Sequence, residues 1–101
     1  SEFVTDSGRR MVLVFADWCG HCKVMMPDFA DVVKKTPGVT FGMIEASDLP
    51  PGFADRYRVH AYPTSLLFEG GVQIASRTGR LTAIELSRFV VHGENVTDLS
   101  E

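Results

Sequence analysis

The most informative stretch of this chain is Met11-Val-Leu-Val-Phe-Ala-Asp-Trp-Cys-Gly-His-Cys-Lys23. Its first six residues form a continuous apolar run with β-branched side chains, which is typical of a central strand covered on both faces. From Gly20 to Lys35, apolar residues recur at helical spacing. Cys19 and Cys22 therefore lie where a predicted strand runs into the N-terminus of a predicted helix.

A helix N-terminus favours the ionised form of a thiol placed at Cys19. Unpaired backbone N–H groups and the positive end of the helix dipole both stabilise a thiolate there. Cys22 follows one turn later on the same side, so it can attack a mixed disulfide held on Cys19 and release the other partner. His21, when protonated, adds positive charge near Cys19, which stabilises the reduced form and makes the disulfide a better oxidant.

Composition and charge exclude several other classes of protein. The chain has 101 residues, 45% of them hydrophobic, and thirteen acidic against ten basic residues give a net charge of −3. This fits one compact domain. The sequence contains no long run of basic residues that could bind nucleic acid, and no apolar stretch of the roughly 20 residues needed to cross a membrane. The two cysteines close too short a loop to act as a stabilising disulfide framework.

A zinc site is the alternative interpretation of a single Cys-x-x-Cys. His21, His60 or His92 could be proposed as further ligands of such a site. Tetrahedral zinc sites usually take a second pair at its own tight spacing, and the sequence contains none. We therefore predict no metal, and we assign His92 to the last turn of the final helix, where it interacts with the helix dipole.

Turn signals divide the rest of the chain into further elements. We expect a strand over residues 39–46, a short helix over 52–58, a β-hairpin over 64–68 and 72–76, and a last helix from a capping box at Thr82 to Val91, ending at Gly93. These elements form a single domain over residues 1–101, with a short lead-in (1–10) and a flexible tail (94–101). Residues 1–3 fit a cloning remnant, and the domain fits an excerpt of a larger protein.

The motif and its surroundings resemble the thioredoxin superfamily. Residues 15–23, with Pro27 five residues after the second cysteine, match its active-site segment, and Trp-Cys-Gly-His-Cys is the form found in its protein disulfide isomerase branch. Tyr57-Arg-Val-His-Ala-Tyr-Pro-Thr64 resembles the segment with the family's cis-proline, Leu67-Phe-Glu-Gly-Gly71 its strand and turn, and Gly79-Arg80 the entry to its last helix. The resemblance implies an α/β thioredoxin fold over Met11 to Gly93. Because only eighteen residues precede Cys19, we expect a shortened version with a four-stranded mixed sheet flanked by helices.

The resemblance also implies roles for single residues. Cys19 is expected to be the nucleophile, Cys22 the resolving cysteine and His21 the residue that sets the redox potential. Arg80 matches an arginine that approaches the active site of disulfide isomerases and helps the resolving cysteine to ionise; an ordinary surface charge is the alternative.

Substrate binding is expected on the surface beside the cysteines. Pro63 would be cis and face the disulfide, and the backbone of Tyr62 would pair with an extended substrate as an added strand. Trp18 and Gly20 belong to the same surface. The expected partners are cysteine-containing protein substrates and a thiol or disulfide redox partner, with no cofactor beyond the Cys19–Cys22 disulfide.

The sequence departs from the family pattern at two informative places. Leu13 stands six residues before the first cysteine, where the family usually buries an acid that relays the proton of the resolving cysteine. His60 and Ala61 stand where disulfide isomerases have an arginine and a glycine. The first departure puts the usual proton relay in doubt.

Together these features predict a protein thiol–disulfide oxidoreductase of the isomerase type. One alternative is a thioredoxin-like reductant, although His21 occupies the place of the proline that a reductant typically has. Another is a substrate-binding or interaction module with weak redox turnover, which Leu13 keeps open. We expect a secretory location such as the endoplasmic reticulum lumen, since disulfides persist there and Asn95-Val-Thr97 matches a glycosylation acceptor.

Overall fold

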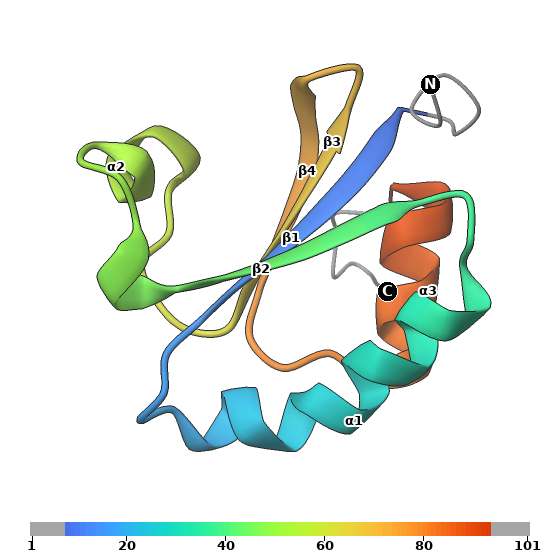
Figure 1. The fold of residues 1–101 in the computed structure, drawn as a ribbon, viewed down its shortest axis with the longest axis horizontal. Helices are drawn as coiled ribbons and strands as arrows, with labels where there is room; N and C mark the ends of the chain where they lie inside the picture. The colour runs from blue at the N-terminus through green and yellow to red at the C-terminus, as the bar shows by residue number, and fades with distance from the viewer. Residues whose placement is uncertain (1–7, 94–101) are drawn as a thin grey trace, which may run out of the picture.

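The computed structural model describes residues 8–93 and shows a four-stranded sheet with helices on both faces (Figure 1). The elements are β1 (Arg9–Phe15), α1 (Gly20–Lys35), β2 (Thr40–Glu45), the 3-10 turn η2 (Ala46–Asp48), α2 (Phe53–Tyr57), β3 (Thr64–Glu69), β4 (Val72–Thr78) and α3 (Ala83–His92). The strand order is β2-β1-β3-β4, with β1 and β2 parallel and the other pairs antiparallel. The expected four-stranded mixed sheet flanked by helices is confirmed.

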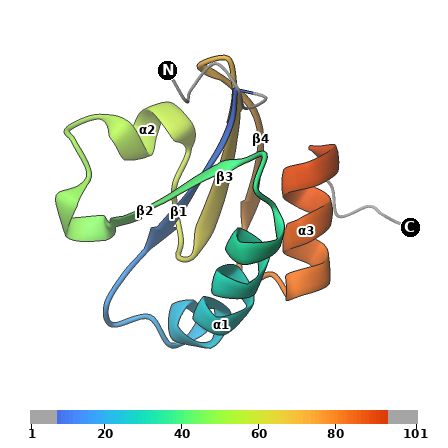
Figure 2. The same ribbon diagram turned by 45° about the vertical axis from the view of Figure 1, so that its right-hand side comes forward.

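Alternation along β1 and β3 builds one apolar core on each face of the sheet. Met11 and Leu13 pack with Leu67 under α1 and α3, whereas Val14 and Leu66 pack under α2. Figure 2 shows α1 and α3 together on one side of the strands and α2 on the other. The central strand β1 is therefore covered on both faces, as its continuous apolar run predicts.

Capping residues set both ends of α3. The side chain of Thr82 accepts a hydrogen bond from Glu85 N–H, and Glu85 accepts one from Thr82 N–H, which completes the predicted capping box of α3. Gly93 ends this helix with φ 70°, a left-handed conformation that glycine adopts without strain. His92 lies in its last turn, as expected.

Most element boundaries differ from the sequence prediction by one or two residues. Strand β1 begins at Arg9, two residues earlier, because the Arg9 guanidinium bonds Val91 O at 2.8 Å and forms an ion pair with Glu69 at 2.5 Å. Helix α2 is shorter than residues 52–58 because Arg58 turns left-handed, with φ 58°. Strand β4 extends to Thr78. The predicted tail and the Asn95 acceptor, like residues 1–7 of the lead-in, lie outside the described residues.

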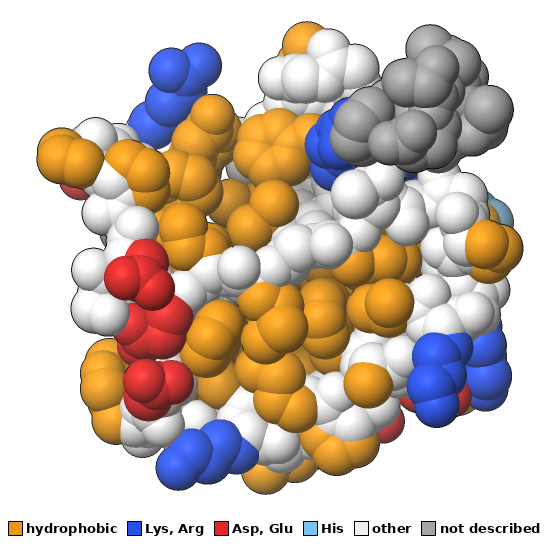
Figure 3. Space-filling view, viewed as in Figure 1, with side chains coloured by type: hydrophobic (Ala, Val, Ile, Leu, Met, Phe, Trp, Pro, Cys, Tyr) orange, Lys and Arg blue, Asp and Glu red, His pale blue; other side chains and the backbone are white. Residues whose placement is uncertain are grey.

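The strands β2 and β4 form the two edges of the described sheet. Figure 3 shows apolar side chains gathered on both sides of β2, which crosses the front of this view. Met43 on β2 is 46% exposed. Within residues 8–93, no helix has the length and apolar character needed to span a bilayer.

Candidate active site

Cys19 is the N-cap of α1, directly after the turn that follows β1. Its N–H bonds Ala16 O at 3.0 Å, and its backbone is extended, with φ −89° and ψ 115°. Its Sγ accepts a hydrogen bond from the Cys22 N–H at 3.2 Å. One of the unpaired amides at the helix start thus points at the sulfur, a geometry that stabilises negative charge when it forms there.

Cys22 lies deeper, on the face of α1 that packs against the sheet. It is 1% exposed, against 6% for Cys19, and both thiols are free. Burial raises the pKa of the Cys22 thiol to about 11, with the hydrogen bond and the charge of Cys19 acting in the same direction and the backbone of Ala16 opposing them. The Cys22 thiol therefore holds its proton to a higher pH than an ordinary cysteine does.

The segment before β3 faces Cys19 from the other side. The Tyr62–Pro63 peptide bond is cis, and the Cys19 thiol donates to Tyr62 O at 3.4 Å. The rings of Tyr62 and Trp18 form a T-shaped pair, with ring centroids 5.8 Å apart, and Trp18 is 76% exposed. The structure thus brings together Cys19, the backbone of Tyr62 and an exposed aromatic surface.

Gly20 and His21 form the first, exposed turn of α1. A side chain added at Gly20 would meet no atom within 4 Å, so the surface beside Cys19 is open to an approaching chain. His21 directly precedes Cys22 in this turn, within the same exposed surface. The predicted role of His21 in setting the redox potential stays a prediction.

Arg80 is exposed and lies in the segment between β4 and α3. The preceding residue, Gly79, donates its N–H to Pro63 O at 2.8 Å, which ties this segment to the cis-proline. Arg80 is not among the groups that shift the pKa of Cys22. The pKa of Glu85 is lowered chiefly by the Thr82 N–H, with Arg77 and Arg80 contributing through their charge. Assistance of Cys22 by Arg80 remains a prediction.

Glu45 is a site residue that sequence reasoning missed. Its carboxylate accepts hydrogen bonds from the Asp17 N–H at 3.1 Å and the Ser47 N–H at 2.8 Å, and also from the Ser47 hydroxyl. These bonds, led by that of the Ser47 hydroxyl, lower the pKa of Glu45. Glu45 therefore ties the end of β2 to the turn that carries Trp18 and Cys19. The sequence carried no local signal for it, because its role comes from the parallel pairing of β1 and β2, which brings their carboxyl ends to one edge.

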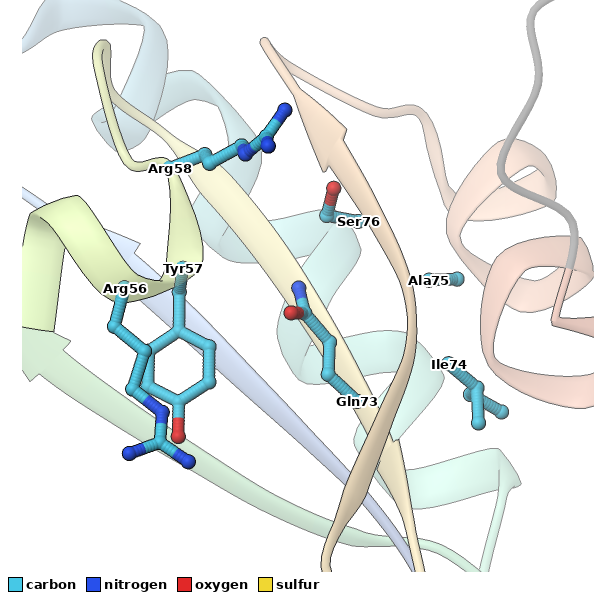
Figure 4. Close-up of a pocket in the computed structure, with 7 residues that line it drawn as sticks. All are labelled: Arg56, Tyr57, Arg58, Gln73, Ile74, Ala75 and Ser76. Atoms are coloured by element: carbon cyan, nitrogen blue, oxygen red, sulfur yellow. The ribbon is translucent and has the colours of Figure 1, made fainter.

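A separate cavity of about 260 Å³ lies between α2 and β4. Its lining residues are Arg56, Tyr57, Arg58, Gln73, Ile74, Ala75 and Ser76. Figure 4 shows Gln73 pointing toward Tyr57, whereas Ile74 and Ala75 point to the opposite side of β4. Neither cysteine lines this cavity, so it is distinct from the candidate active site. Over residues 8–93, no three His, Cys, Asp or Glu side chains cluster as metal ligands would.

Comparison with known proteins identifies the family. The sequence model described as Thioredoxin matches residues 1–92, so the chain belongs to the thioredoxin family. It is 32% identical to thioredoxin C-3 of Corynebacterium nephridii over 91 residues, covering 89% of this chain and 62% of that protein. It is 33% identical to an H-type thioredoxin of Fagopyrum esculentum, and the match covers 86% of this chain and 75% of that protein. A Schizosaccharomyces pombe protein named for a presumed disulfide-isomerase activity is 29% identical, over 78% of this chain and 16% of that protein.

Solved structures agree with this assignment. Fasciola hepatica thioredoxin superposes with a TM-score of 0.74 at 25% identity, covering 88% of this chain and 84% of that one. Mitochondrial thioredoxin 3 of Saccharomyces cerevisiae superposes with a TM-score of 0.73 at 26% identity, and the match covers 88% of this chain and 82% of that one. The chain thus spans most of these solved domains, and just under two thirds of the Corynebacterium relative.

Proposed function

We propose that this protein exchanges disulfides with cysteine-containing protein chains through the Cys19–Cys22 pair. The observation that carries this proposal is the inequality of the two thiols. Cys19 caps a helix beside an open, aromatic surface, and Cys22 is buried one turn behind it with its pKa raised to about 11. This inequality supports Cys19 as the sulfur that attacks a substrate and Cys22 as the sulfur that releases it.

In the reducing direction, the Cys19 thiolate attacks a substrate disulfide and forms a mixed disulfide, while the departing substrate sulfur takes up a proton. Cys22 then loses its proton and attacks Cys19 Sγ. The bond between Cys19 and the substrate breaks, the Cys19–Cys22 disulfide forms, and the second substrate sulfur leaves as a thiol after protonation. Two electrons pass to the substrate, and the reverse sequence donates a disulfide.

We further propose the isomerase type of this chemistry, in a secretory compartment such as the endoplasmic reticulum lumen. The support is His21 in Trp-Cys-Gly-His-Cys, because a protonatable group in the first turn stabilises the reduced form and makes the disulfide more oxidising. Oxidising compartments are where such a disulfide donor functions. Fractionation of the native cells that recovers the protein outside secretory compartments would contradict this location.

A thioredoxin-like reductant is the second candidate. It is favoured by the names of the relatives that are 32% and 33% identical, both of which are thioredoxins. The two candidates share the cysteine pair and differ in the direction of electron flow. The third candidate is an interaction module with weak redox turnover. It differs from the other two in its slower rate of disulfide exchange.

The reduction potential of the Cys19–Cys22 pair separates the first two candidates. Protein disulfide isomerase lies at about −180 mV and thioredoxin at about −270 mV, a difference of about 4 kcal/mol for two electrons. We expect a value near the former after equilibration in glutathione buffers and quantification of the oxidised fraction. A value near the latter would establish the reductant. Failure to turn over a model disulfide peptide in either direction would leave the interaction module.

A further inference from the structure

Ser65, on β3, presents an unusual hydroxyl. The residue is fully buried, and its Oγ has no hydrogen-bond partner among residues 8–93. Its neighbour Thr64, also buried, donates its hydroxyl to Ala61 O at 2.7 Å. Buried polar groups are almost always paired, with protein or with ordered water, so a hydroxyl without a protein partner calls for an explanation.

The sheet register places Ser65 on the face of the sheet that α1 and α3 cover. Ser65 pairs directly with Leu13 on β1, so the two side chains leave the sheet on the same face, with Cβ atoms about 4.5–5.5 Å apart. Leu67, next along β3 on that face, belongs with Leu13 to the apolar cluster that contains Met25. Met25 follows Cys22 by three residues on the buried face of α1, the helix that lies over this side of the sheet (Figure 2).

Two features of this face of the sheet surround the position of Ser65 in the register. The buried cluster contributes apolar side chains from β1, β3, α1 and α3. On β4, Arg77 pairs with Ser65, but its charge acts on Glu85 at the start of α3. The hydroxyl of Ser65 is therefore a buried polar group on the face of the sheet that α1 covers, without a protein partner among residues 8–93.

Closing the disulfide creates a need for such a group. Cys22 must lose its proton inside the protein before it attacks Cys19 Sγ, and Leu13 has no group that can exchange one. We propose that Ser65 is a positioning residue whose hydroxyl holds a water molecule between β3 and α1, and that this water takes the Cys22 proton. The proposal rests on the disulfide exchange proposed above.

The step balances as follows. The Cys22 proton passes to the water and from there toward solvent, the Cys22 thiolate attacks Cys19 Sγ, and the substrate sulfur leaves and is protonated from solvent. When the disulfide opens, the departing Cys22 sulfur recovers a proton by the same route. A hydroxyl both donates and accepts, so it can orient the water in either direction. It also adds no buried charge, unlike a carboxylate.

The test compares reduced wild-type protein with Ser65→Ala and with Ser76→Ala, a matched change on β4. Ser76 pairs with Leu66, so it lies on the opposite face of the sheet. The readouts are the pKa of Cys22, from NMR titration of protein with ¹³C-labelled cysteine, and the rate at which a mixed disulfide with a model peptide resolves. Ser65→Ala should lose this water and its hydrogen bond to the Cys22 thiolate, which should raise the pKa of Cys22 by about one unit and slow resolution about tenfold. The first attack by Cys19 should keep its rate, and Ser76→Ala should change neither readout.

A second pair of variants separates the hydroxyl from the packing. Ser65→Thr and Ser65→Val add side chains of the same shape, and only the first keeps the hydroxyl. We expect the threonine variant to resolve faster than the valine variant and to keep the lower Cys22 pKa. Equal values for this pair, or a Ser65→Ala variant like wild type in both readouts, would overturn the proposal. The titration needs no substrate, so it tests Ser65 even if wild-type protein exchanges no disulfide, a result that would refute the proposed function separately.

Discussion

Replacing Leu13 with glutamate would show what a buried acid does for this active site. Leu13 is fully buried in the cluster under α1. A carboxyl group there loses its hydration, so its pKa rises toward neutrality and it can exchange a proton with the Cys22 thiol. We expect Leu13→Glu to resolve the mixed disulfide faster than wild type near pH 7, with the first attack by Cys19 unchanged.

Stability should change in the opposite direction. Burying a leucine side chain contributes about 1.5–3 kcal/mol, much of which glutamate forfeits. Burying a polar group without full compensation costs about 1–3 kcal/mol more. We therefore expect a loss of about 3–5 kcal/mol in the free energy of unfolding, a large part of the roughly 5–15 kcal/mol typical of a domain. Ser65 is the cross-strand neighbour of this position, and a hydrogen bond from its hydroxyl to the new carboxyl group would keep the loss of stability near the lower end of that range.

The assay pairs stopped-flow kinetics of both steps with urea denaturation, and Leu13→Gln is the matched control. Glutamine has the same shape and a similar burial cost but cannot exchange a proton at neutral pH. The reasoning requires similar losses of stability in the two variants and faster resolution with glutamate only. Equal resolving rates in Leu13→Glu and Leu13→Gln would refute it, because the rate would then reflect a loosened core.

Three further predictions follow from the same structure. His21→Pro should lower the reduction potential measured in glutathione buffers, because it removes a group that favours the reduced form; an equal or higher potential would remove His21 from that role. Thr82→Ala should cost about 0.5–2 kcal/mol in a urea melt by removing one half of the α3 capping box, and a smaller loss would mean that Glu85 alone caps the helix. Reduced protein should lose stability as pH rises from about 9 to about 11, because the unfolded Cys22 thiol ionises near 9.0 whereas the folded one holds its proton to about 11. Denaturation of Cys22→Ser over the same range should show a smaller decline.

The parts of the fold that sequence predicted were those set by local patterns. The apolar run before Cys19, the capping box at Thr82 and the glycine at position 93 each act over a few residues, and each appears in the structure as expected. The start of β1 was not predictable in this way. It depends on Arg9 reaching the last carbonyls of α3, more than eighty residues away in sequence.

The same distinction applies to the site. The motif located Cys19 and Cys22, and the helix start explains their different surroundings. Glu45 and Ser65 were missed because their importance comes from the sheet register, which pairs Phe15 with Glu45 and Leu13 with Ser65. A serine in an apolar strand is unremarkable in sequence. It becomes informative only when its hydroxyl is known to be buried without a protein partner.

The division of labour between the two cysteines is the central claim, and trapping the mixed disulfide tests it most directly. Cys22→Ser and Cys19→Ser are each mixed with a model disulfide peptide, and the adducts are mapped by mass spectrometry after acid quenching. We predict that Cys22→Ser accumulates peptide on Cys19, whereas Cys19→Ser forms little adduct because the remaining thiol is buried and protonated. Rapid accumulation of peptide on Cys22 in Cys19→Ser, with no adduct on Cys19 in the other variant, would contradict the assignment.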